Sequence, residues 1–165
     1  MNRKFRLFAI PAAAAVAAAT ATGVLTTASS ASTAASGTTT IHVRELNQHV
    51  TYVPIGQLTG SKAQQNQGDY LAFDDPLVNP TNYKHKWGNI EGTCTLVYVS
   101  SQNYYCSVNF IFPHGTLSAD GTALGTGKVT VVPINGGTGA YQGAHGTARV
   151  QLGNTTNDFV LTFTN

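Results

Sequence analysis

The chain has 165 residues, of which 42% are hydrophobic and only 10% are charged, and its formal net charge at pH 7 is +2. Three of its nine cations stand in the first six residues, so six cations and seven acidic residues remain beyond them, a net charge of −1. Because the remaining cations are scattered, no basic patch supports binding to nucleic acid.

The N-terminus has the pattern of a secretory signal peptide. The cationic stretch "MNRKFR" precedes an apolar, alanine-rich run, and the small-residue segment "TTASSASTAASG" follows. We expect residues 1–35 to be removed by cleavage at about residues 31–36, which predicts a secreted, extracellular protein. An uncleaved membrane anchor is the alternative, but alanine and threonine insert weakly into a bilayer. Residues 37–165 would then form a single domain, with no membrane contact after cleavage.

The rest of the chain carries strand patterns and no convincing helix. Eight segments are rich in Val, Thr, Tyr and Phe, and turn residues separate them. They are residues 41–53, 68–75, 94–100, 104–112, 115–124, 128–134, 146–152 and 158–165. Longer loops are expected at residues 55–67 and 79–92. An all-β protein of eight antiparallel strands follows.

Without helices to cover a flat sheet, these strands must close into a barrel or stack as two sheets. We favour an eight-stranded antiparallel β-barrel, because eight strands leave an interior just wide enough for side chains or one small ligand.

The two cysteines flank a predicted hairpin. Cys94 and Cys106 stand on either side of "TLVYVSSQNYY", which we expect to turn at residues 100–103. They would therefore face each other across adjacent strands, and an oxidising compartment favours a disulfide between them. A reactive thiol is the alternative, but neither cysteine belongs to a CxxC motif.

The glycine-rich segment "GGTGAYQGAHG", residues 136–146, raises the question of a phosphate-binding loop. Such a loop needs a helix after it, whereas "AHGTARVQL" alternates like a strand. The glycine spacing also misses the GxGxxG fingerprint by one residue. We therefore predict a strand-to-strand turn in which Gly136, Gly137 and Gly139 need positive φ and Tyr141 starts the return strand. Gly143 and Gly146 would allow the barrel wall to bend or to approach closely.

Metal binding receives no support from the five histidines. His42, His49, His85, His114 and His145 are dispersed, and none pairs with another at a ligand spacing on one face. We therefore expect no metal site and no cofactor.

Four segments resemble the allene oxide cyclase barrel and dirigent protein superfamily. They are "PINGGTGAYQGAHGTARVQ", "EGTCTLV" followed by "YYCSVNFIF", "GTLSADG", and "FDDPL", and the similarity spans about residues 43–162. We identify the chain as a bacterial-type secreted member. The resemblance implies an eight-stranded barrel with a hydrophobic interior pocket, and a homotrimer is one assembly found among such proteins.

The resemblance also implies site residues. The plant cyclases use a Glu-x-Asn pair, a Pro, an Asn, a Cys and a Tyr, and the matching positions here are Glu45, Asn47, Pro54, Asp75, Cys94 and Ala123. The dirigent "DDPL" motif adds Asp74 as a pocket residue. Glu45 and Asp75 are the catalytic candidates, because burial raises a carboxyl pKa and suits it to proton transfer.

Each of these residues also has a structural interpretation. Glu45 would face outward, beside Arg44 or His49, if the strand had the opposite orientation. Asp74 and Asp75 before Pro76 also form a favourable turn. If Cys94 is bridged to Cys106, it cannot serve as a pocket thiol. The missing Tyr at position 123 disfavours the plant cyclase reaction.

Two functional hypotheses follow, together with a simpler one. The first is a barrel that binds a hydrophobic small molecule and guides the stereochemistry of a reactive intermediate. The second is an isomerase or cyclase that acts on an unsaturated or epoxide substrate through Glu45, aided by Asp75 and Asn47. The simpler possibility is a barrel that its own side chains fill.

Overall fold

The computed structural model describes residues 37–55 and 65–165. The signal-peptide prediction for residues 1–35 lies outside the described residues, as does most of the loop predicted at 55–67. Nine strands form. They are β1 (Thr39–Leu46), β2 (Val50–Val53), β3 (Tyr70–Val78), β4 (Lys86–Tyr98), β5 (Asn103–Phe112), β6 (Gly115–Ala123), β7 (Val129–Gly137), β8 (His145–Gln151) and β9 (Thr156–Thr164).

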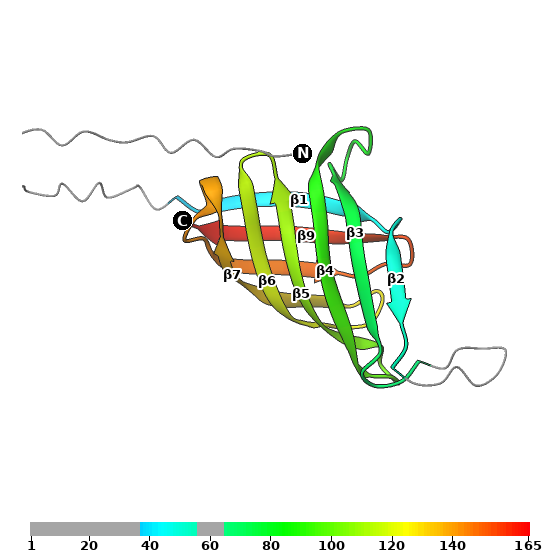
Figure 1. Ribbon diagram of the computed structural model, residues 1–165. Helices are drawn as coiled ribbons and strands as arrows, with labels where there is room; N and C mark the ends of the chain where they lie inside the picture. The colour runs from blue at the N-terminus through cyan, green and yellow to red at the C-terminus, as the bar shows by residue number, and fades with distance from the viewer. Residues whose placement is uncertain (1–36, 56–64) are drawn as a thin grey trace, which may run out of the picture. The chain divides into compact units, whose positions relative to one another are not determined.

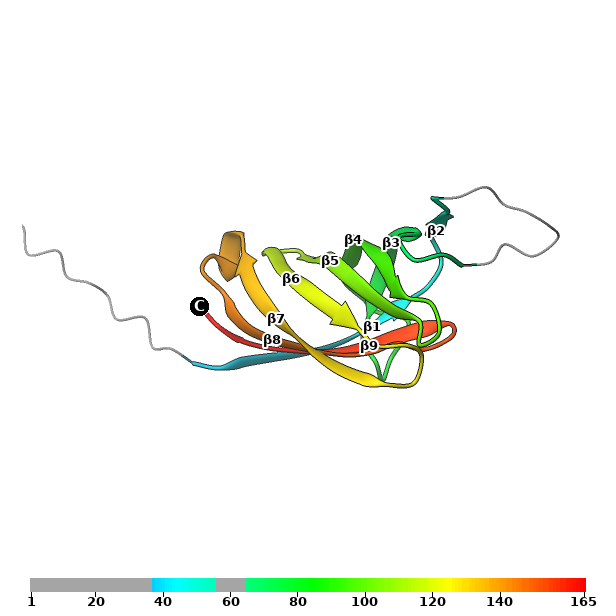
Figure 2. The same ribbon diagram turned by 90° about the horizontal axis from the view of Figure 1, so that it is seen from below.

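The strands form one closed, antiparallel barrel. The order is β1-β9-β8-β7-β6-β5-β4-β3-β2, and β1 also pairs with β3, which closes the ring (Figure 1). Viewed from below, β4–β6 face β1, β8 and β9 across the interior (Figure 2). The predicted eight-stranded antiparallel β-barrel is therefore confirmed.

The eighth position in the ring is shared by β1 and β2. The end of β1 pairs with one end of β3, at Glu45↔Leu77, whereas β2 pairs with the other end, at Val50↔Phe73. The predicted single strand 41–53 is thus broken at residues 47–49. Because β1 and β2 share one place in the ring, nine strands occupy eight positions around the barrel wall. The break between β1 and β2 lies beside the candidate site described below.

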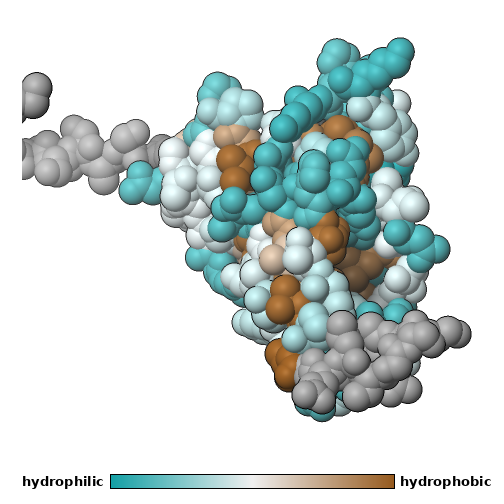
Figure 3. Space-filling model, turned by 45° about the vertical axis from the view of Figure 1, so that its right-hand side comes forward, coloured by the Kyte–Doolittle hydropathy of each residue, from teal (hydrophilic) through white to brown (hydrophobic). Residues whose placement is uncertain are grey.

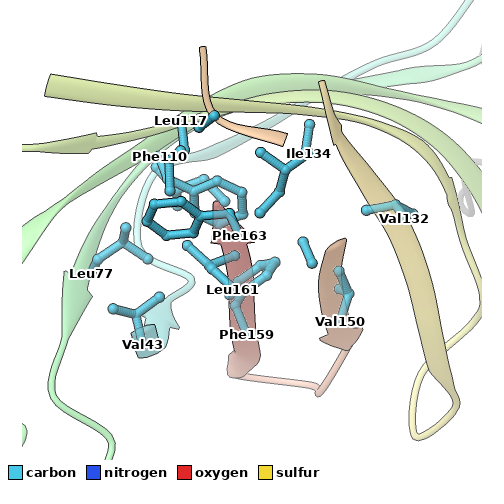
Figure 4. Close-up of a cluster of buried hydrophobic side chains, with 14 of the residues drawn as sticks. Val43, Leu77, Phe110, Leu117, Val132, Ile134, Val150, Phe159, Leu161 and Phe163 are labelled. Carbon is cyan, nitrogen blue, oxygen red and sulfur yellow. The ribbon is translucent and has the colours of Figure 1, made fainter. Parts of the chain in front are cut away.

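Alternation along each strand builds the core at one end of the barrel. Interior positions carry large apolar side chains there, including Phe110, Leu117, Leu161 and Phe163 (Figure 4). The rings of Phe110 and Phe159 meet edge to face, with centroids 5.1 Å apart. Because burial of one such side chain contributes about 1.5–3 kcal/mol, this end supplies a large share of the barrel's stability.

The glycine-rich segment turns the chain from β7 to β8 through a short 3-10 helix, η1 (Gly139–Tyr141). Gly139 and Gly143 have positive φ, at 60° and 78°. Gly136 and Gly137 lie within β7 without positive φ, so that part of the turn prediction was wrong. A Cβ on Gly137 would still lie 2.3 Å from a backbone oxygen, so tight packing requires glycine there.

Tyr141 and Gly146 complete this connection. Tyr141 belongs to η1 rather than to the return strand, and its ring packs edge to face against Phe112 and Phe163, at 5.8 and 5.6 Å. A Cβ on Gly146 would lie 2.1 Å from the carbonyl oxygen of Thr162, which confirms the predicted close approach. The segment turns the chain and covers the core end of the barrel.

Strand β4 begins at Lys86, so the loop predicted at residues 79–92 is only seven residues long. The rest of that segment pairs with β3 and β5, for example Ile90 with Asp75 and with Phe110. Asn79 shapes the remaining loop, because its Oδ1 accepts hydrogen bonds from the backbone amides of Thr81 and Asn82.

Seen from the side of β2 and β3, apolar side chains form separate patches among hydrophilic ones (Figure 3). In the described ranges, no helix has the length and apolar character needed to cross a membrane.

Candidate functional site

A cavity of about 210 Å³ occupies the other end of the barrel interior. We call this end the hollow half, and the end packed around Phe110 the closed half. All eight wall positions contribute to the cavity. Its lining consists of Glu45, Asn47, Val50, Leu71, Phe73, Ile90, Cys94, Tyr104, Cys106, Val108, Ala119, Gly121, Ala123, Thr126, Val132, Val150, Leu152, Gly153, Asn157 and Phe159.

Small side chains on β6 leave this space open. The interior face of β6 carries Leu117 in the closed half and then Ala119, Gly121 and Ala123 in the hollow half. A Cβ on Gly121 would lie 2.7 Å from a methyl carbon of Val132, so glycine also allows β7 to pack closely here. The sequence of β6 therefore sets where the core ends and the cavity begins.

A disulfide forms part of the cavity wall. Cys94 on β4 and Cys106 on β5 are bonded directly across the strand pair, with Cα atoms 4.0 Å apart. The bridge is therefore as the sequence predicts, and the hairpin turns at residues 99–102, one residue before the predicted position. Cys94 does line the cavity, but as half of a disulfide it is not available as a thiol.

Three polar side chains meet at one side of the cavity. The Nδ2 group of Asn157, on β9, donates to Glu45 Oε2 at 2.7 Å and to Asn47 Oδ1 at 3.1 Å. Asn157 Oδ1 in turn accepts from the backbone N–H of Gly153 at 3.0 Å. Glu45 is only 3% exposed. A hydrogen-bonded polar cluster is thus set into an otherwise apolar wall.

Asp75 lies behind Glu45 and supports the break between β1 and β2. Its Oδ1 accepts from the backbone amides of Gln48 and His49, both at 2.7 Å, and the His49 Nδ1 atom is 3.8 Å away. These amides have left the β ladder, so the carboxyl oxygen satisfies two otherwise unpaired donors. The buried Asp75 therefore fixes the direction in which the chain resumes as β2.

The carboxyl groups of Glu45 and Asp75 form a pair. Burial raises the pKa of Glu45 from 4.5 to about 7, against the hydrogen bond from Asn157, and the charge and hydrogen bond of Asp75 raise it further. Asp75 Oδ2 is buried and lacks another partner among the described residues, so it can accept a hydrogen bond from the protonated Glu45 carboxyl. Glu45 is therefore a carboxyl that holds its proton near neutral pH.

A second buried carboxylate has a structural role. Asp69 accepts from the backbone amides of Ile55 and Asn66, at 2.9 and 2.6 Å, and from the phenol of Tyr52. These bonds lower the pKa of Asp69, the Asn66 amide most. The hydrogen bond to Asp69, together with burial, raises the pKa of Tyr52 to about 12. Asp69 thereby connects chain segments that flank residues 56–64.

Some of the predicted site residues lie at the cavity and others do not. Glu45, Asn47 and Cys94 line the cavity, and Asp75 is fully buried beside Glu45. Arg44 faces outward and pairs with Asp158, so the outward alternative for Glu45 is wrong.

Two of the predicted pocket residues do not reach the cavity. Asp74 lies on the exposed face of β3, where its Oδ1 accepts from Asn89, so its assignment to the pocket was wrong. Pro54 follows β2 and is not among the lining residues, so that assignment was wrong as well. In both cases the motif match could not show which way the side chains face.

Sequence reasoning missed three polar lining residues, which are Asn157 and Tyr104 on strands and Thr126 in the turn after β6. Asn157 stands two positions before Phe159 and shares its interior face, just before the predicted strand 158–165. Tyr104 likewise shares the interior face of Cys106 and Val108 on β5. Strand alternation would have indicated Tyr104 once Cys106 was placed inside the barrel, and Asn157 once Phe159 was placed inside.

No group of three or more metal-ligating side chains occurs within residues 37–55 and 65–165. The polar cluster of the cavity combines one carboxyl with two amides, and its Asn157 amide is fully occupied by protein partners. Its chemistry is therefore that of hydrogen bonding and proton transfer.

Comparison with known proteins gives one family match. The family of dirigent-like proteins matches residues 11–164. No curated protein matches the chain significantly in sequence.

Solved structures share the fold at low identity. A pyocyanin demethylase is 21% identical, with 75% of this chain and 99% of that chain covered and a TM-score of 0.62. A pterocarpan synthase dirigent protein is 18% identical, with 78% and 96% covered and a TM-score of 0.66. A heme-binding cyclase that catalyses a 4 + 2 cycloaddition in neoabyssomicin biosynthesis is 20% identical, with 79% and 68% covered and a TM-score of 0.60.

Proposed function

Because the chain belongs to the family of dirigent-like proteins, we propose that its barrel binds a hydrophobic small molecule in the hollow half and orients it as a reactive intermediate. The observation that carries this proposal is the cavity itself. Apolar side chains and a disulfide form most of its wall, and the polar groups are few and positioned. Such an arrangement is typical of small-molecule sites, in which apolar surface gives affinity and a few polar atoms fix orientation.

The volume indicates the size of the ligand. A cavity of about 150 Å³ can hold benzene, and drug-sized sites run from about 300 to 1,000 Å³. At about 210 Å³, this cavity suits a molecule of one or two rings, or the end of a longer one. Structural neighbours that act on ring systems, a pterocarpan synthase dirigent protein and a cycloaddition catalyst, support the proposal.

Filling the cavity tests this proposal. p-Xylene should raise the melting temperature of the wild-type protein, because a ligand that binds only the folded state stabilises it. Ala123→Phe and Val108→Phe each place a ring in the cavity and should abolish the shift, whereas Thr122→Phe, on the exposed face of β6, should preserve it. A folded Ala123→Phe protein with an undiminished shift would show that the probe binds elsewhere. Native mass spectrometry of protein purified from culture medium would then identify a natural ligand.

Glu45 supports a second candidate function, that of an isomerase or cyclase. A protonated carboxyl in a cavity wall can donate a proton to an unsaturated or epoxide substrate and take one back, as a general acid and base. The pKa of Glu45, raised to about 7 by burial, suits that role near neutral pH. Conversion of a co-purified ligand by wild type but not by Glu45→Gln would establish catalysis. If the wild-type protein leaves the ligand unchanged, the result would support binding without catalysis.

Export and assembly complete the proposal. We expect a secreted protein that lacks residues 1–35, and N-terminal mass analysis of the exported chain tests this cleavage. The same native spectra would show whether the protein is a homotrimer.

A further inference from the structure

The polar groups of the cavity lie on two opposite walls. One wall has Glu45, Asn47 and Asn157, from β1, the break after it, and β9. The other has Tyr104, on β5. In the closed ring, β5 stands four strands from β9 in either direction, so Tyr104 and Asn157 are on opposite sides of the barrel.

On the first wall, the amide donor left without a protein partner among the described residues is Asn47 Nδ2. Asn157 uses its Nδ2 on Glu45 and Asn47 and its Oδ1 on Gly153. Glu45 Oε2 accepts from Asn157, and the Glu45 carboxyl group also interacts with Asp75. Asn47 gives only its Oδ1 to this cluster, so among the described residues its Nδ2 donor has no partner.

On the opposite wall, the Tyr104 hydroxyl is held so that its proton stays available. Its oxygen accepts from Gln65 Nε2 at 3.3 Å, and Gln65 Oε1 in turn contacts Gln102 Nε2 at 3.5 Å. Within the described part of the chain, no acceptor takes the Tyr104 O–H proton. A phenol oxygen that accepts one hydrogen bond from the protein can still donate one to a ligand.

The surface between the two walls is apolar. Phe73, Val108, Val132, Val150 and the disulfide face the space, and Thr126 is exposed in the turn after β6. A ligand that spans the cavity would therefore meet a donor at each end and only apolar contacts between them. A polar group in the middle of the ligand would be buried without a hydrogen-bond partner, which is costly. A hydrogen-bond acceptor at either end would meet a donor, which is favourable.

We infer that the cavity selects apolar molecules carrying a hydrogen-bond acceptor at each end, one received by Asn47 Nδ2 and the other by the Tyr104 hydroxyl. This inference rests on the proposed binding function and specifies its ligand class. Tyr104 is then a specificity-determining residue on the wall opposite the carboxyl pair.

A series of neutral probes tests the inference. p-Xylene has no acceptor, 4-methylanisole has one, and 1,4-dimethoxybenzene and the longer 2,6-dimethoxynaphthalene each have two. Affinities measured by NMR titration should rise with the number of acceptors, by about three- to tenfold for each bond formed. Tyr104→Phe should reduce the affinity for the better-fitting diether by about that factor and leave p-xylene unchanged. Tyr105→Phe, the exposed neighbour, is the matched control.

The outcomes separate the inference from the proposed function. If neither p-xylene nor any ether binds, the proposed function fails. If p-xylene binds but Tyr104→Phe leaves both diethers unaffected, the inference is wrong while the binding function stands. An equal loss of affinity for p-xylene and for the diethers would reveal a packing effect of Tyr104 and would also overturn the inference.

Discussion

The closed and hollow halves of the barrel share the same strands but differ in what fills their interiors. On β5, Phe110 and Phe112 face the closed half, whereas Tyr104, Cys106 and Val108 face the hollow half. On β6 the change is from Leu117 to alanines and a glycine. Close packing gives stability, whereas space and positioned polar groups allow binding.

This division separates stability from function along each strand. The closed half contains edge-to-face aromatic contacts and, among the residues that the structure describes, no buried carboxyl group of its own, so it can hold the wall rigid. The hollow half contains a disulfide and a carboxyl pair, which limit how far its less packed wall can relax. A site on a rigid scaffold keeps its polar groups in position.

Truncation of one phenylalanine in each half tests the comparison most strongly. Phe110→Ala should lower the free energy of unfolding by about 3–5 kcal/mol, because it creates a cavity in a packed core. Phe73→Ala should cost less, about 1–2 kcal/mol, because Phe73 is partly buried and already borders empty space. Urea unfolding measures both. Equal losses would show that the hollow half is packed as tightly as the core.

Much of the fold could be predicted because alternation and turn residues act locally. The segments around Cys106 and Phe159 show strand periodicity strongly enough to give both the elements and the closed architecture. The break after Leu46 was missed, because its amides are satisfied by Asp75, a residue distant in the chain. Local patterns contain no information about such a partner.

The site was partly predicted, for a related physical reason. Glu45 and Asn47 follow from the motif that resembles the cyclases, and the structure places both at the cavity. The role of Asp75 depends on which of two adjacent acids faces inward, and only the pairing of β3 with its neighbours decides that. Asn157 reaches Glu45 across the β1–β9 pair, a contact that no spacing in the sequence indicates.

The carboxyl pair predicts a pH dependence located in the hollow half. Because the pKa of Glu45 is about 7 in the folded chain and 4.5 without the fold, the folded state binds more protons between these values. Stability should therefore fall as pH rises from about 4.5 to 7 and then level off, a loss of about 3 kcal/mol from this group. Urea unfolding at several pH values measures the loss.

Three variants test whether Glu45 causes this loss of stability with rising pH. Glu45→Gln should remove this part of the slope, whereas Glu91→Gln, which removes an exposed carboxyl from β4, should retain it. Phe110→Ala should lower stability at every pH and leave the slope unchanged. A slope that survives in Glu45→Gln would place the titrating group elsewhere.

The smallest expected effect is a change in one pKa, and Asp75→Asn tests it by separating the causes of the Glu45 shift. Asparagine keeps an oxygen for the Gln48 and His49 amides, so the break between β1 and β2 should persist. The substitution removes the neighbouring negative charge, so the pKa of Glu45 should fall below 7. It should stay above 4.5, because burial is the largest cause of the shift. The titration midpoint of Glu45 can be measured directly by NMR of its carboxyl carbon. A midpoint that is the same in Asp75→Asn as in the wild type would mean that burial alone keeps the proton on Glu45.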